Sequence, residues 1–191
     1  MKLVRWVAVL MVFSFAGIAF AADEAAKPVN QYLGAGKCKT CHNSAKKGAQ
    51  FTKWAESKHA NAYLVLASPK AIEIAKAKGL TNPQKAAECL ECHVTGYNEP
   101  KDHFAASFSD SMGVQCESCH GAGSNYSKMA TMKDITAKKA DGAKFGLLTV
   151  TKDTCAKCHN ERATGGKFVS WPADSAKIAH PMPPGAAAPA E

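Results

Sequence analysis

Every cysteine in this chain lies in one short repeated motif. The eight cysteines form four copies of C-x-x-C-H, at residues 38–42, 89–93, 116–120 and 155–159. This motif is the attachment site of c-type haem: both thiols form thioethers with the porphyrin, and the adjacent histidine binds the iron. No cysteine is left over. The sequence therefore predicts four covalently bound haems c and a redox function.

The motif residues have two expected roles. The cysteines expected to hold haem are Cys38, Cys41, Cys89, Cys92, Cys116, Cys119, Cys155 and Cys158. The histidines expected to bind iron on the proximal side are His42, His93, His120 and His159. Zinc sites built from paired C-x-x-C units, or disulfides, would also use an even number of cysteines. Neither alternative requires a histidine directly after each second cysteine.

The N-terminus has the pattern of a secretory signal peptide. Lys2 and Arg5 precede the apolar stretch 6–20, and Ala19-Phe20-Ala21 is a small-x-small cleavage site. The alternative is an uncleaved membrane anchor, but the stretch is short for a spanning helix. We therefore expect a signal peptide at 1–21 and a mature periplasmic or extracellular protein that does not span a membrane.

The rest of the chain predicts one domain, a tetrahaem cytochrome c domain at 22–180, with a flexible Pro/Ala-rich tail at 181–191. So few residues per haem leave little conventional core, and we expect the porphyrins to form the core. The fold class is mainly α: a small multihaem cytochrome with helices and long loops wrapped round four closely packed haems.

Local signals predict where several helices lie. Residues 51–67 have helical character, and Ser68-Pro69 is a start signal for a helix that stops at Gly79. Asn82-Pro83 repeats that signal before the second motif. Further helices are expected at 133–140 and 174–179, and no strand pair is expected.

The net charge of +8 is weak evidence for an anionic partner. Haem propionates offset much of it, and the scattered lysines are expected to balance them. No run of basic residues interleaved with aromatics suggests a nucleic-acid surface, so no nucleic-acid partner is expected.

Three histidines outside the motifs are candidates for the distal iron position: His59, His103 and His180. Neutral imidazole is a preferred ligand of haem iron. Three imidazoles cannot serve four irons. At least one haem must therefore use methionine, use a side chain of another molecule, or stay five-coordinate.

The chain resembles the tetrahaem cytochrome c-554 family. The matching stretches, which extend beyond the haem motifs, are 54–60, 92–97, 113–124, 155–160 and 178–181. The resemblance implies a largely helical protein with haems in parallel-stacked and near-perpendicular pairs. It also implies three bis-histidine haems and a five-coordinate second haem. By the same resemblance, His59 is the distal ligand of the third haem and His180 that of the fourth.

The chain departs from that family at the first haem. Ala130 stands where the family pattern places the distal histidine, and Met129 and Met132 flank it. We expect Met132 to be the ligand of the first haem, with Met129 as second choice; both could instead be ordinary helix or core methionines. His103 has no assigned role in the resemblance, and it could cap the second haem, cap the first, or bind neither.

The expected function is that of an exported electron carrier, not an enzyme, which relays single electrons between redox partner proteins. One alternative is an enzyme acting on a small nitrogen oxide at an open haem. Another is a subunit of a conducting filament, in which a second copy completes the missing ligand. A monomeric carrier is favoured, since no catalytic constellation is visible in the sequence.

Overall fold

The computed structural model describes residues 29–163 and 170–180, and these residues are mainly helical. The α-helices are α1 (Ala35–His42), α2 (Gln50–Ala55), α3 (Pro69–Ala77), α4 (Ala87–His93), α5 (Cys116–His120), α6 (Met129–Thr136), α7 (Lys152–Ala156) and α8 (Ala173–Ile178). Short 3₁₀ helices lie at Ala45–Lys47, Leu64–Ala67, Lys101–His103, Asp110–Met112 and Gly142–Phe145. Over the described ranges, β pairing is limited to one isolated parallel bridge, between Tyr32 and Phe104. The predicted mainly α class is confirmed.

Helix α3 begins and ends where the sequence predicts. The Ser68 hydroxyl accepts a hydrogen bond from the Ala71 N–H at 3.2 Å, and Pro69 occupies the first helical position. This is the usual way in which serine and proline start a helix. The chain leaves the helix through Gly79, whose φ of 75° suits glycine. Helix α8 also lies where it was expected.

Other boundaries differ from the prediction. The Asn82 side chain accepts from the Gln84 N–H at 2.9 Å and forms a turn, so α4 begins only at Ala87. The predicted helical stretch 51–67 is broken into α2, a series of turns and a 3₁₀ helix. Helix α6 starts before residue 133 and ends at Thr136, since Lys138 adopts a left-handed φ of 56°. The predicted signal peptide (1–21) and tail (181–191) lie outside the described residues.

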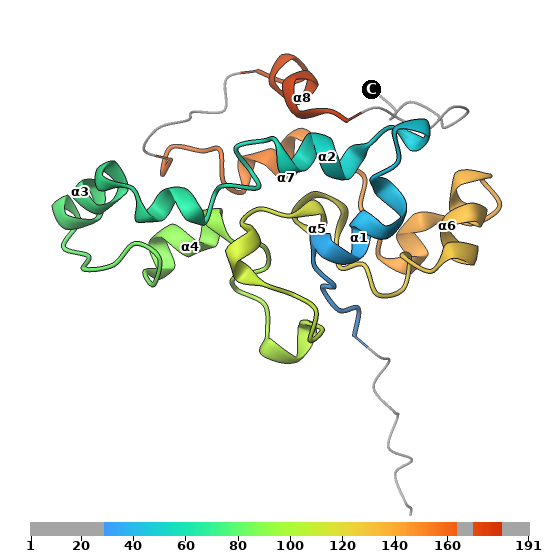
Figure 1. The fold of residues 1–191 in the computed structure, drawn as a ribbon, viewed down its shortest axis with the longest axis horizontal. Coiled ribbons are helices and arrows are strands. Elements are labelled where there is room, and N and C mark those ends of the chain that lie inside the picture. Colours follow the sequence, from blue (N-terminus) through green and yellow to red (C-terminus); the bar gives the residue numbers. More distant parts are fainter. Residues whose placement is uncertain (1–28, 164–169, 181–191) are drawn as a thin grey trace, which may run out of the picture.

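Each C-x-x-C-H motif lies on a short helix. The first three are in α1, α4 and α5, and the fourth begins in α7 and continues into the following turn. In a helix, residues three apart lie on the same face, so the two thiols of one motif can reach one porphyrin. Figure 1 shows α1 and α5 near the middle of the molecule, α3 and α4 at one end, and α6 at the other.

The hydrophobic core of the polypeptide is small. Of the side chains that the structure describes, the buried hydrophobic ones are Ala35, Ala62, Leu66, Ala75, Val94 and Tyr126. Three of these are alanines, whereas several large hydrophobic side chains, such as Ile72 and Leu148, are half exposed. Such a core cannot account for a folded domain by hydrophobic burial alone. The fold thus leaves apolar surface available for apolar groups other than its own side chains.

Gly113 allows the chain to pass close to His59, and we expect Gly113→Ala to destabilise the protein by about 3 kcal/mol or more. A Cβ there would lie 2.7 Å from the His59 carbonyl oxygen, and the φ of Gly113 is 70°. Gly79→Ala is the matched control, because Gly79 has a φ of 75° but open space around its Cα. Backbone strain alone should cost about 1–2 kcal/mol at that control position. Urea denaturation followed by circular dichroism measures both changes; equal losses would contradict the steric account.

Candidate haem-binding site

The four motifs contact one another in a defined order. The thiol of Cys38, in the first motif, lies close to that of Cys116, in the third, since each thiol shifts the pKa of the other. Cys92, in the second motif, forms the same kind of contact with Cys158, in the fourth. The third and fourth motifs also lie close together, because a charge on Cys155 would raise the pKa of Cys119. In space, the motifs therefore follow the order first, third, fourth, second.

Side chains of the third motif and its approach cap the helix that carries the first. The Ala35 N–H donates to the Gln115 side-chain oxygen at 2.7 Å, and the Gly34 N–H donates to Glu117 Oε2 at 2.8 Å. The first N–H groups of a helix have no partner within the helix. Here residues about 80 positions away supply the acceptors. These bonds fix α1 against α5.

A threonine ties the chain after the second motif to the third. The Thr95 hydroxyl lies 2.8 Å from the Ser118 hydroxyl and accepts a hydrogen bond from the Gln115 N–H at 2.7 Å. Thr95 and Gln115 are almost fully buried. Buried polar groups are retained where their hydrogen bonds are satisfied, and this network positions α5 at the centre of the motifs.

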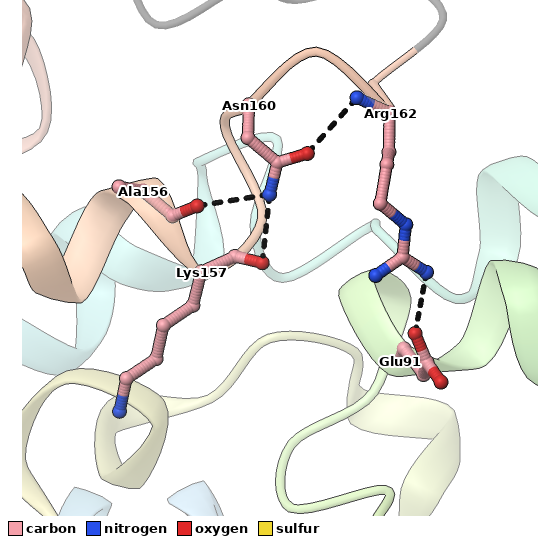
Figure 2. Close-up of polar contacts among 5 residues, drawn as sticks. All are labelled: Glu91, Ala156, Lys157, Asn160 and Arg162. Atoms are coloured by element: carbon pink, nitrogen blue, oxygen red, sulfur yellow. Dashed lines mark hydrogen bonds and ion pairs between the residues drawn. The ribbon is translucent and has the colours of Figure 1, made fainter.

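The second and fourth motifs are joined at the surface (Figure 2). The Arg162 guanidinium donates to Glu91 Oε2 at 2.6 Å, and Glu91 lies within the second motif. The Asn160 amide donates to the carbonyl oxygens of Ala156 and Lys157, and its own carbonyl accepts from the Arg162 N–H at 3.0 Å. The turn after the fourth motif is thereby shaped so that Arg162 reaches Glu91.

Four histidines form two pairs with a spacing suited to a shared metal ion. The ring centroids of His59 and His159 are 6.0 Å apart, and those of His120 and His180 are 5.9 Å apart. An imidazole nitrogen binds a first-row metal at about 2 Å, so two rings on opposite sides of one iron have centroids roughly 6 Å apart. Burial lowers the pKa values of His59 and His120, and the charges of their neighbours add to this. Both imidazoles are therefore neutral at pH 7, as metal ligands must be.

This pairing is the reverse of the one that the resemblance implies. His59 lies beside His159 of the fourth motif, not beside the third, and His180 lies beside His120 of the third motif, not beside the fourth. The physical reason is the path of the chain between the motifs. The Val114 N–H donates to the His59 carbonyl at 3.0 Å, and the Trp54 indole donates to the Val114 carbonyl at 2.8 Å. These bonds hold the His59 segment across the start of the third motif, from where its imidazole reaches the fourth.

The second motif's histidine has a fixed orientation. His93 Nδ1 lies 2.5 Å from the Ala62 carbonyl oxygen. A carbonyl only accepts, so Nδ1 carries the proton and Nε2 is left to bind a metal. Among the described residues, ring contacts between histidines are confined to the two pairs above, so His42 and His93 have no imidazole partner of this kind.

The other distal candidates lie elsewhere. His103 Nδ1 contacts Glu99 Oε2 at 3.0 Å, which leaves its Nε2 available but brings it to no other histidine. A cavity of about 380 Å³ lies beside it, lined by residues that directly follow the second motif, Val94–Tyr97, and by Glu99 among others. Met132 is half-buried on α6, whereas Met129 is 64% exposed. These residues stay candidates.

The residues present fit covalent haem better than zinc. All eight cysteines are free thiols. Burial raises the pKa of Cys119 to about 11 and that of Cys158 to about 12, so both are protonated at pH 7. Among the described residues, no three or more potential ligands gather into a metal site. The paired imidazoles, the oriented His93 and the small core all match a chain folded around porphyrins.

Comparison with known proteins indicates one family for this chain. Residues 37–121, which include the first three motifs, match the family described as cytochrome c554 and c-prime. Cytochrome c-554 of Nitrosomonas europaea is 31% identical over 140 residues, or 67% of this chain. The chain belongs to the cytochrome c-554 family. The match spans 57% of that relative's length, and no solved structure matches this chain.

Both matches are cytochromes, which agrees with the covalent haem expected at the C-x-x-C-H motifs. Within residues 29–163 and 170–180, no helix is long and apolar enough to cross a membrane. The sequence interpretation missed the contribution of Gln115 and Glu117, which hold the first motif's helix. The one sequence signal for this role was Glu117, an acidic residue inside the third haem motif, where haem attachment requires no acidic side chain.

Proposed function

We propose that this cytochrome holds four haems and relays single electrons along them between two redox partner proteins. The observation that carries the proposal is the series of contacts between motifs, which runs from the first through the third and fourth to the second. Bound haem iron takes up or gives one electron by changing between ferric and ferrous. The eight motif cysteines would hold the four groups, with the four motif histidines as proximal ligands.

The chain's own residues set the geometry of that relay. His59 and His180 would supply distal ligands to the fourth and third haems, in the pairing that the ring distances support. Gln115 and Thr95 fix the central motif by their hydrogen bonds to Ala35 and Ser118. Close contact between motifs favours rapid electron transfer between haems of one molecule. The relay would therefore need no conformational change.

Export and partners complete the proposal. The signal-peptide pattern at 1–21 supports secretion to the periplasm, where covalent haem attachment takes place, and a mature domain at 22–180 with a short tail at 181–191. Its partners would be one redox protein that donates electrons and one that accepts them. The cytochrome itself would bind them as a monomer. A filament of this cytochrome remains the alternative assembly, because a second copy could complete an iron that lacks a ligand.

A second candidate function is chemistry on a small nitrogen oxide at the second haem. The observation that favours it is that His93 has no partner imidazole among the described residues, while a cavity follows its motif. An iron with one vacant position could bind such a molecule. Proton delivery would also be needed; Glu99 lines that cavity and contacts His103.

A coulometric titration of the purified protein tests the relay. We expect four electrons per chain and full re-oxidation by a one-electron acceptor. Carbon monoxide added to the reduced protein separates the two functions. A carrier with all irons six-coordinate shows no carbon monoxide spectrum, whereas binding to about one iron in four supports the open site. Fewer than four electrons per chain would contradict the relay itself.

Met132 is the proposed distal ligand of the first haem. We expect Met132→Leu to free one iron, so that the carbon monoxide-binding fraction rises by one haem in four and the first haem's potential falls, because methionine ligation raises potential. Met129→Leu is the matched control on the same helix, and it should change neither, since Met129 is mostly exposed. Ferric spectra that both variants leave unaltered would contradict ligation by either methionine.

A further inference from the structure

Glu117 is a buried carboxylate inside the third motif to which the relay described above assigns no role. The residue is 2% exposed, and it is the one buried acidic residue among those that the structure describes. Charged side chains are almost never fully buried unless they are paired. In residues 29–163 and 170–180, the ion pairs involve Glu91, Glu99 and Asp174 as the acidic partners, so no cation neutralises Glu117.

Three backbone N–H groups hold the carboxylate instead. Oε1 accepts from the Leu33 and Gly123 N–H groups, and Oε2 accepts from the Gly34 N–H, all at 2.8 Å. Gly123 permits the close approach, because a Cβ there would lie 2.9 Å from Oε1. Each backbone N–H can only donate a hydrogen bond. A glutamine side chain or a protonated carboxyl at this position would therefore place a second donor against one of these N–H groups. Burial raises the pKa of Glu117, and the three amides oppose that rise and favour the ionised form.

The charge lies where two haem motifs meet. Glu117 is adjacent to Cys116, whose thiol contacts that of Cys38 in the first motif. The negative charge of Glu117 raises the pKa of both thiols, although other causes outweigh it at Cys116. An electrostatic field that disfavours a negative charge on these sulfurs also disfavours the addition of an electron to a haem attached to them. Buried charges act strongly because the low dielectric around them screens little.

We propose that Glu117 is a fixed negative charge that lowers the reduction potentials of the first and third haems. Ferric iron carries one more positive charge than ferrous, so a nearby anion stabilises the oxidised form. The inference rests on the four-haem relay proposed above. Glu117 is not an iron ligand. Its charge acts electrostatically, through space, on the two haems whose cysteines meet beside it.

The test is spectroelectrochemistry on the four-haem protein with Glu117→Gln. We expect two of the four redox transitions to move to more positive potential and the other two to stay in place. Glu117→Asp, which keeps the charge, should remain near the wild type. Gln115→Ala is the neutral control: it removes the acceptor of the Ala35 N–H and disturbs the same end of α1 without changing charge. Equal shifts in Gln115→Ala and Glu117→Gln, or no shift in the latter, would overturn the proposal.

A measurement on the wild type keeps the proposal testable if Glu117→Gln does not fold. Redox-difference infrared spectra of protein labelled with ¹³C-glutamate report the state of the buried carboxyl group. We expect an ionised carboxylate band that shifts when haems are reduced, and a protonated-carboxyl band in both redox states would refute the inference. A wild-type protein with fewer than four haems would contradict the relay, whereas four haems with unmoved potentials would contradict only the role of Glu117.

Discussion

Replacing Cys116 and Cys119 together with alanine is expected to remove one haem and to unfold most of the remaining protein. The third motif contacts the first through Cys38, the fourth through Cys155, and the chain after the second through Ser118. Because the polypeptide buries few large side chains of its own, the haem at this centre would supply much of the apolar contact. We expect a loss of more than about 4 kcal/mol, a large fraction of the roughly 5–15 kcal/mol by which domains are usually stable.

The same double change at the first motif is the matched control. Cys38 and Cys41 belong to the motif at one end of the contact order, and Cys41 is exposed. Cys38→Ala with Cys41→Ala should also remove one haem but leave a folded protein with three. Haem content by mass spectrometry and unfolding by circular dichroism measure both outcomes. If the two variants lost the same stability, the third motif would not be the centre of the fold.

The second large effect concerns the distal histidines, and His59→Ala should convert one iron from six-coordinate low-spin to high-spin. Electron paramagnetic resonance of the ferric protein counts such irons. The informative variant combines His59→Ala with His159→Met. If both side chains serve one iron, as their 6.0 Å separation indicates, the double variant still perturbs a single haem.

The control combines His59→Ala with His120→Met, which would touch two different irons. We expect two perturbed haems there and one in the His159 combination. The opposite result would restore the pairing implied by family resemblance, with His59 on the third haem. The same design applied to His180 should give one perturbed haem with His120→Met and two with His159→Met, since His180 lies 5.9 Å from His120.

Local signals in the sequence predicted some of this architecture well. The α3 boundaries follow from the serine cap, the proline after it and Gly79, all of which act within a few residues of the helix. The helical class and the family also follow from short motifs. The start of α4 was wrong because Asn82 uses its side chain for a turn, which competes with a helix cap of the same residue type.

The arrangement of the site could not be predicted in the same way. Contacts between Gly34 and Glu117, or between His59 and His159, join residues that are 80 or more positions apart. No local preference determines which of two distant motifs a histidine will face, because that depends on the path of all the chain between them. Long-range hydrogen bonds such as that from Trp54 to Val114 decide it, and they are visible only in three dimensions.

The positions of the four irons test the central claim most directly. Anomalous diffraction at the iron edge from crystals of the purified protein locates each iron and, through the attached cysteines, assigns it to a motif. We predict four irons per chain, with the first nearest the third, the third near the fourth, and the fourth nearest the second. Fewer than four irons, or irons spaced in the order of the motifs along the sequence, would contradict the relay.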